Sequence, residues 1–404
     1  MSKPKSKSMP LSLSHKCLIA ANCLNSFYEI FIGFMILVIV SSFANPIAAV
    51  AIYHFMLFGM VVLGFVFIVK NVKRGGVARM WAYRTGVLIG IASLVLIATQ
   101  GMEGNAYIVG AMFGAYAGLQ AFAKEAVISD TVSAKQMTKF TSYNSAAGSS
   151  FKLFAPALIG IIAGAYSYSV AAIAIIPLLL ASFVVSFFID GGGGGKDHSL
   201  QFSKFIRLAR RSLHMKRVFI ADFLMGITLW GSMGTITAIY AAQIFETPAS
   251  VGMLGSIVMA FLIAVKFAIA RFGGAKHLAA ILKVAIAVFF IVAAVFLTLE
   301  GKAWFVAYNL AYVALASLME MQMFIYMWSA LRVAGISPRL TSEYQFVRQI
   351  TLNIGRYIGY GALFGIGIFG AAGAMKWILI AMMGIVVIVV RLYYKMNRDE
   401  GHKL

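Results

Sequence analysis

Charged residues are scarce in this chain. Only 12% of its 404 residues are Asp, Glu, Lys or Arg, whereas 61% are hydrophobic. Soluble domains contain about 25% charged and about 45–50% apolar residues. The composition therefore excludes an ordinary soluble protein and indicates a chain that is dissolved in lipid.

Acidic residues are the scarcest of the charged types. There are 13 Asp and Glu against 34 Lys and Arg, which gives a net charge of +21. In a soluble protein this excess would point to nucleic acid. In a membrane protein it reports topology, because Lys and Arg are retained on the cytoplasmic side. The positions of the basic residues, given below, favour topology, so no nucleic-acid partner is expected.

Cysteine is almost absent, and the motifs of several enzyme classes are missing. Cys17 and Cys23 fall in one predicted helix, where they serve as small apolar residues rather than as a disulfide. The sequence shows no Gly-rich nucleotide loop, no metal-ligand spacing of His, Cys and Asp, and no Ser-His-Asp arrangement. We therefore expect no enzyme, no cofactor, no metal site, no catalytic residue and no ATP-driven mechanism.

Long apolar runs dominate the sequence. A helix needs about 20 apolar residues to cross about 30 Å of hydrocarbon. The basic start leads into a run that is too long for a cleavable signal peptide. We predict an all-α integral membrane protein with twelve transmembrane helices, at 17–42, 47–69, 85–100, 104–127, 141–166, 168–189, 216–243, 250–270, 279–299, 302–331, 342–371 and 373–395.

Basic residues gather in alternate loops. With twelve spans both termini lie on one side, and the basic loops place that side in the cytoplasm. The outside loops hold only Lys302 and Lys376 among basic residues. This pattern predicts a multi-pass protein of the plasma membrane. The compact loops favour a bacterial inner membrane. The basic residues on the cytoplasmic side are Lys70, Lys73, Arg74, Arg79 and Arg84, then Lys196, Lys204, Arg207, Arg210, Arg211, Lys216 and Arg217, then Arg271, Lys276 and Lys283, and finally Arg391, Lys395, Arg398 and Lys403.

One long polar segment divides the chain near its middle. It contains the five glycines 191–195, which are typical of a flexible linker. We expect an N-terminal six-helix bundle at 1–189, a Gly-rich and basic cytosolic linker at 190–215, and a C-terminal six-helix bundle at 216–404. The part 202–215 mixes basic and apolar residues. This mixture is typical of a helix that lies on an anionic leaflet, and it fits an ordinary basic cytosolic loop equally well.

The two halves show traces of a repeat. A shift of 198 aligns the turn 73–76 (Lys-Arg-Gly-Gly) with 271–274 (Arg-Phe-Gly-Gly), and a shift of 204 aligns Lys152 with Arg356. With twelve helices, a basic linker and these turns, the chain resembles the major facilitator superfamily. That resemblance implies two pseudo-symmetric six-helix bundles, alternating access, and gating by Lys73 and Arg271. Ala270 and Val72 stand where the family's turn motif has an aspartate.

Four charged residues fall near the middle of predicted spans. They are Glu29, Lys152, Glu320 and Arg356, and they come from both halves. Charges at this depth cost roughly 2.5–3.5 kcal/mol each, so they usually mark a pathway or a partner. Two interpretations remain: the four line a central polar cavity, or Glu29 pairs with Lys152 and Glu320 with Arg356 only to hold helices together.

Polar residues accompany these charges and complete a predicted site. Cations on equivalent helices of the two halves favour an anionic substrate. Glu29 and Glu320 are the predicted proton carriers, and His54 lies too near the outer end for that role. The predicted substrate-binding residues are Lys152, Arg356, Arg348, Asn353, Tyr143, Asn144 and Asn25, and the predicted gating residues are Lys73, Arg271, Asp222 and Glu343.

The sequence thus predicts a secondary active transporter, either a symporter or an antiporter. It would move a small organic anion by alternating access, with the proton as coupling ion, as a monomer in the lipid bilayer. Two alternatives stay open. One is proton-driven efflux of amphipathic or cationic compounds that Glu29 and Glu320 attract. The other is a non-transporting sensor or assembly protein that docks a partner through 196–217.

Overall fold

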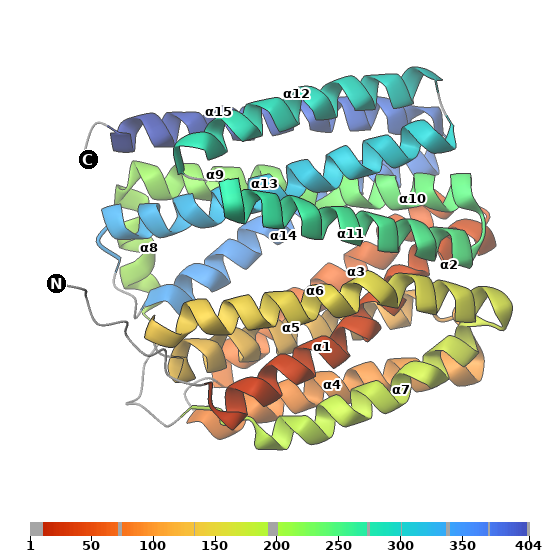
Figure 1. Ribbon diagram of the computed structural model, residues 1–404, viewed down its shortest axis with the longest axis horizontal. Helices are drawn as coiled ribbons and strands as arrows, with labels where there is room; N and C mark the ends of the chain where they lie inside the picture. Colours follow the sequence, from red (N-terminus) through yellow and green to blue (C-terminus); the bar gives the residue numbers. More distant parts are fainter. Residues whose placement is uncertain are drawn as a thin grey trace. The chain divides into compact units, whose positions relative to one another are not determined.

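The computed structural model describes residues 11–71, 75–132, 134–192, 201–272, 275–299, 301–336, 340–370 and 372–401. Most of these residues are helical, and none of them forms a strand (Figure 1). Eleven of the described helical segments are long and apolar enough to cross a membrane. The remaining predicted span, at 342–371, corresponds to α14 (Thr341–Ile368), which is long enough but carries Glu343, Arg348 and Arg356. The prediction of an all-α membrane protein is confirmed.

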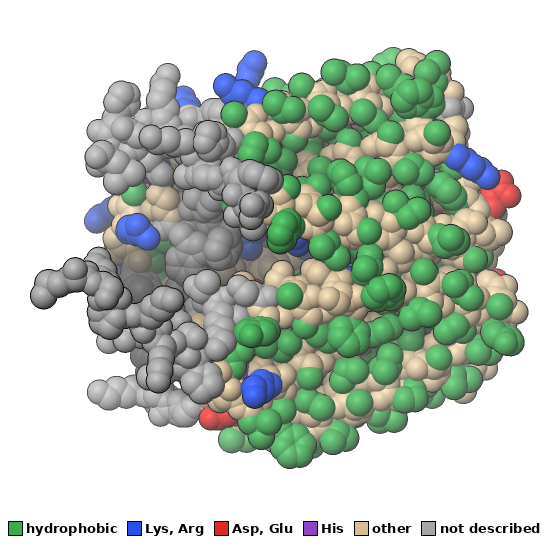
Figure 2. All heavy atoms as spheres, in the orientation of Figure 1, with side chains coloured by type: hydrophobic (Ala, Val, Ile, Leu, Met, Phe, Trp, Pro, Cys, Tyr) green, Lys and Arg blue, Asp and Glu red, His purple; other side chains and the backbone are tan. Residues whose placement is uncertain are grey.

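Hydrophobic side chains cover the outside of the helices. Figure 2 shows them spread over the face that it draws, with Lys and Arg mostly near the helix ends. Phe67, Phe154, Phe267 and Trp377 are each at least 60% exposed. Such exposure would be costly in water, but it is what lipid-facing helices need.

Contacts divide the chain into two compact units. The first is Met1–Met35 with Gly59–Ser199, and the second is Ile36–Phe58 with Leu200–Leu404. The division near residue 199 falls close to the predicted linker. The segment 36–58, however, packs with the second unit, because its side chains lie against α14: the Phe55 ring stacks on Tyr357 at 5.5 Å, and Asn45 donates to the Gly367 carbonyl at 2.7 Å.

The first unit is built around α1 (Leu13–Gly33), which packs against α6 (Ala134–Ala165) and α7 (Tyr168–Val185). A second helix, α4 (Gly75–Gln100), packs against α7 and against α5 (Ala106–Thr131). Tyr28 is fully buried in the core of this unit and bonds to Ser93 at 2.6 Å. Its hydroxyl and ring thereby join α1 to α4 and α5. The short η2 (Ser186–Phe188) follows directly at the end of α7.

The second unit is arranged around α9 (Leu213–Ile227) and α14, which lie side by side (Figure 1). In Figure 1, α12 and α13 also neighbour one another. The remaining helices are α2 (Met35–Ser42), the first part of α3 (Pro46–Asn71), α8 (Phe202–Arg211), α10 (Met233–Phe245), α11 (Pro248–Phe272), α12 (Ala275–Leu299), α13 (Lys302–Val333), the short η5 (Ala372–Ala374) and α15 (Met375–Gly401).

The span predicted at 216–243 is a broken helix. Between α9 and α10 the chain forms η3 (Thr228–Ser232), a π-helical turn in which Gly231 leaves helical geometry at φ −133° and ψ −119°. Such a break releases backbone groups from their usual bonds, and membrane helices tolerate it where other groups satisfy them. Here the Leu229 carbonyl accepts a bond of 2.7 Å from the Tyr312 hydroxyl.

Candidate functional site: charged residues within the helices

Glu29 and Lys152 form a loose ion pair between α1 and α6. Lys152 Nζ lies 3.6 Å from Glu29 Oε2, and the two side chains are 40% and 43% exposed. The pairing that the sequence allowed is therefore present in the first unit. Because both groups remain accessible, the pair adds little stability and is poorly suited to a purely structural role.

Two asparagines of α1, Asn22 and Asn25, contact different neighbours. Asn22 donates to Asn144 of α6 at 3.0 Å, close to the ion pair. Asn25 is only 2% exposed and donates to Tyr83 of α4 at 2.9 Å and to Gln120 of α5 at 3.1 Å. Asn25 thus clasps neighbouring helices. Tyr143 of α6 is 57% exposed.

Arg356 of α14 reaches the broken helix. Its Nε donates to the Trp230 carbonyl at 2.9 Å, and its Nη1 donates to Asn353 Oδ1 at 3.2 Å. The guanidinium also lies over the Phe58 ring, 4.4 Å from its centroid. No carboxylate pairs with Arg356 within the described parts of the chain, so its charge is met only by dipoles and a ring face.

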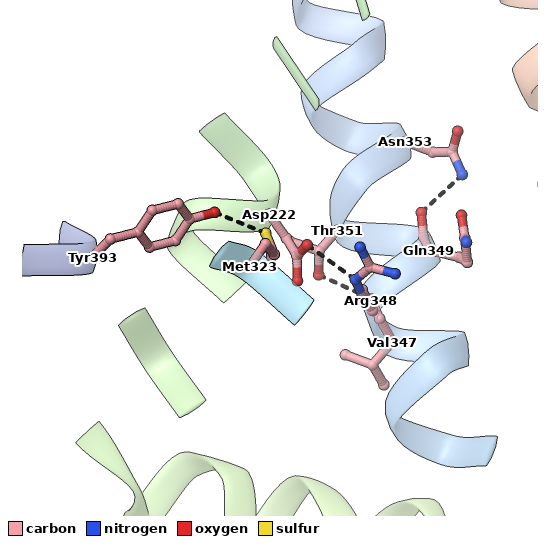
Figure 3. Close-up of polar contacts among 8 residues, drawn as sticks. All are labelled: Asp222, Met323, Val347, Arg348, Gln349, Thr351, Asn353 and Tyr393. Atoms are coloured by element: carbon pink, nitrogen blue, oxygen red, sulfur yellow. Dashed lines mark hydrogen bonds and ion pairs between the residues drawn. The ribbon is translucent and has the colours of Figure 1, made fainter. Parts of the chain in front are cut away.

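Arg348, two turns earlier on α14, pairs with Asp222 of α9 (Figure 3). Arg348 Nε lies 3.1 Å from Asp222 Oδ1, and the side chains are 20% and 0% exposed. The guanidinium also lies 5.6 Å from the Trp230 ring. Asp222 Oδ2 is buried and has no hydrogen-bond partner among the described residues. A residue predicted to assist binding and one predicted to act as a gate therefore form one buried pair.

The acidic residues Glu320 and Glu343 lie apart from these pairs. Glu320 on α13 is exposed, and it does not pair with Arg356, which bonds instead to Trp230 and Asn353. The alternative of a structural Glu320–Arg356 pair is thus absent from the structure. Glu343 is 3% exposed and accepts a bond of 2.7 Å from the Gln201 backbone N–H.

Two predicted gating residues fall where the structure gives no side-chain geometry. Lys73 lies outside the described residues. Arg271 belongs to the last turn of α11, but its side chain also lies outside them. Among the residues that are described, no group of three His, Cys, Asp or Glu side chains is placed to hold a metal ion.

Several solved membrane transporters have a similar arrangement of helices. A POT family peptide transporter is 11% identical, with a TM-score of 0.72 over 95% of this chain and 96% of that chain. The xylose transporter XylE from E. coli is 14% identical, with a TM-score of 0.64 over 95% and 98%. A bacterial homologue of the iron transporter ferroportin is 13% identical, with a TM-score of 0.63 over 95% and 97%.

The chain has the major facilitator fold. No protein-family model matches the sequence, and neither does any curated protein. At identities of 11–14% the likeness extends to the fold alone. Within the major facilitator fold, the expected multi-pass membrane architecture is confirmed.

The structure also contains a row of buried, hydrogen-bonded polar side chains that the sequence did not predict. His54 Nδ1 donates to the Val50 carbonyl at 2.8 Å, so Nε2 accepts from the Thr235 hydroxyl at 3.3 Å. The Tyr360 hydroxyl lies 3.1 Å from that of Thr235, and its ring stacks on His54 at 4.5 Å. The three residues come from α3, α10 and α14. Because they are far apart in sequence, only the presence of a histidine within a span could have signalled them.

Proposed function

We propose that this chain is a secondary active transporter that moves a small organic anion by alternating access and couples it to protons. The observation that carries this proposal is the uncompensated charge of Arg356. A guanidinium within a membrane helix is costly, and a pairing carboxylate usually offsets that cost. Arg356 has no such partner among the described residues, although Asp222 serves Arg348 nearby on the same pair of helices.

Arg356 retains donors for an anion. Its Nε and Nη1 each make one bond, to Trp230 and Asn353, while a guanidinium has further N–H groups in the same plane. A carboxylate or phosphate can accept two such bonds side by side. Asn353 and the Trp230 carbonyl hold the guanidinium in place, so little side-chain entropy is lost when an anion binds. Arg348 assists by its charge from two turns away.

Lys152 supplies the corresponding cation in the first unit. Its ion-pair partner Glu29 lies at 3.6 Å, which is longer than a good charge-assisted bond. A substrate anion competes with Glu29 for the ammonium, and protonation of Glu29 releases Lys152 to the substrate. Asn144 and Tyr143 lie two turns or more away on the same helix and contribute polar contacts, whereas Asn25 acts by holding α1 in place.

The remaining acidic and basic residues complete the proposed cycle. Glu320 carries a second proton, since it is exposed and forms no ion pair in the described structure. Asp222 and Glu343 fasten α9 and α8 to α14 in one state and release them in another. Lys73 and Arg271 act as gates in the basic turns. The protein works in a bacterial inner membrane with both termini in the cytoplasm.

The experiment begins with a thermal-shift screen of the purified protein against organic acids, sugar phosphates, amino acids and cations at two pH values. An anion that stabilises the protein is then used in proteoliposome uptake. We expect Arg356→Gln and Lys152→Gln each to reduce uptake about tenfold or more, the loss of one charge-assisted bond. The matched control is Arg332→Gln, an exposed arginine at the end of α13. Unchanged uptake in both site variants would refute the anion assignment.

Efflux of cationic compounds is the second candidate. The exposed carboxylate of Glu320, which forms no ion pair with any residue that the structure describes, favours it. The similar solved structures do not choose between an anion and a cation, because they include a peptide transporter, a xylose transporter and a homologue of an iron transporter. If the protein exports cations, Glu29→Gln and Glu320→Gln abolish proton-driven efflux, while Lys152→Gln and Arg356→Gln leave it intact.

A further inference from the structure

The short helix α8 presents a row of basic side chains to solvent. Lys204, Arg207, Arg210 and Arg211 are exposed, and so is Lys216 at the start of α9. We name these five residues the basic platform. No acidic residue occurs between Gln201 and Val218 to neutralise it. Lys and Arg side chains are visible in Figure 2 over the region that α8 occupies in Figure 1.

The apolar side of α8 faces the protein. Phe205 is 1% exposed, and its ring lies 6.4 Å from Phe219 of α9 and 6.3 Å from Tyr344 of α14. Phe202 lies 5.2 Å from Phe346. The aromatic residues that would otherwise insert into a leaflet are therefore used to dock α8. What remains for an external partner is a positively charged surface on a fixed support.

The connection to α9 places the platform at the membrane surface. Ser212 is the single residue between the two helices, and its side chain caps α9 by accepting a bond from the Met215 N–H at 3.3 Å. A helical segment that is long and apolar enough to span a membrane begins at Leu213. Because the ten residues of α8 extend only about 15 Å, all its basic side chains lie close to the end of a spanning helix. Headgroups of the adjacent leaflet occupy that level.

We propose that the basic platform binds the headgroups of anionic phospholipids in the leaflet next to the start of α9. Arginine donates to phosphate oxygens in pairs, and each basic residue at an anionic surface strengthens binding about fivefold. Ile206 and Leu213, 43% and 57% exposed beside the platform, contact the acyl chains. This surface is distinct from Arg356 and Lys152, so the proposal does not depend on what the chain transports.

Lipid bound there would also support α14. The Gln201 N–H at the start of α8 donates to Glu343 in the first turn of α14 at 2.7 Å. The docked aromatic rings reinforce the same connection. Neutralising the repulsion among the platform's charges therefore stabilises the packing of α8 against α9 and α14.

The experiment uses the full-length chain in detergent, with phosphatidylglycerol or phosphatidylcholine added. Native mass spectrometry measures bound lipid, and the apparent Tm measures stabilisation. The test variant is K204Q/R207Q/R210Q/R211Q. The charge-keeping variant is R207K/R210K/R211K, and the control K302Q/R332Q neutralises two exposed basic residues elsewhere in the second unit.

We expect the wild type to bind phosphatidylglycerol roughly tenfold or more tightly than phosphatidylcholine, with a preference that weakens at high salt. The test variant loses this preference, and the charge-keeping and control variants retain it. Retention by the test variant, or equal stabilisation by inorganic phosphate, would overturn the proposal. If the test variant does not fold, R207Q and R210Q decide singly: each lowers phosphatidylglycerol affinity severalfold, and unchanged affinity in both overturns the proposal.

Discussion

Arg348, Lys152 and Arg356 all carry positive charge within long helices, yet each meets a different environment. Arg348 has a fully buried carboxylate at 3.1 Å. Lys152 has an accessible one at 3.6 Å. Arg356 has a backbone carbonyl, an amide oxygen and an aromatic ring. The energetic consequence differs accordingly, because removing one partner from a buried pair leaves an uncompensated charge, whereas an accessible charge is screened.

Asp222→Asn should therefore destabilise the protein much more than Glu29→Gln. We expect a loss of about 3 kcal/mol for Asp222→Asn, because the mostly buried Arg348 guanidinium would lose the charge of the Asp222 carboxylate at 3.1 Å. Glu29→Gln should cost less than about 1 kcal/mol, since that pair is about 40% exposed. Equilibrium unfolding of the purified protein in detergent measures both. Equal losses in the two variants would show that burial does not separate these pairs.

The hydrogen-bonded residues His54, Thr235 and Tyr360 allow a second test of how buried polar groups contribute to stability. Thr235→Val removes the hydroxyl that lies within bonding distance of His54 and Tyr360 and keeps the side chain's shape. We expect a loss of about 2 kcal/mol, because two buried polar groups lose a partner. The matched control is Thr298→Val, an exposed threonine whose hydroxyl donates to carbonyls of its own helix. A thermal-unfolding series that ranks the two alike would contradict the prediction.

At the scale of elements, α9 and α14 pack so closely that glycine is required. A Cβ at Gly355 would collide with the Phe223 carbonyl, and one at Gly226 would collide with the Leu352 carbonyl. Small residues allow helix backbones in membranes to approach in this way. The close contact brings Arg348 and Arg356 of α14 to Asp222 and to the broken segment η3. The glycines of α14 are thus part of how the charged residues are positioned.

Gly355→Ala and Gly361→Ala form a matched pair on α14. We expect Gly355→Ala to cost about 2 kcal/mol or more, because backbone atoms must move to admit the methyl group. Gly361 has nothing within 4 Å of an added Cβ, so its substitution should change stability by less than about 1 kcal/mol. Unfolding in detergent distinguishes them. If Gly355→Ala were as stable as Gly361→Ala, the close approach of the two helices would be wrong.

At the scale of the whole molecule, the distribution of basic residues predicts which helix ends face the cytoplasm. Replacing Cys17 and Cys23, the two cysteines of the chain, yields a background for single-cysteine labelling. In intact cells we expect Lys302→Cys to react with a membrane-impermeant thiol reagent. Lys204→Cys should react only after the membrane is opened. Both lysines are exposed in the structure, so accessibility within the protein is matched. The reverse labelling pattern would overturn the proposed topology.

Composition and apolar run length were enough to predict the helical membrane fold, because a span needs only about 20 apolar residues whatever its neighbours are. They also identified charged residues that are rare within spans, including Lys152, Arg348 and Arg356. Their partners depended on tertiary structure. The break at Thr228–Ser232, the Asp222–Arg348 pair and the inward docking of Phe205 each join residues that are distant in sequence or depend on such neighbours. Such contacts depend on how the helices pack against one another, so they cannot be predicted from the local pattern of a single sequence.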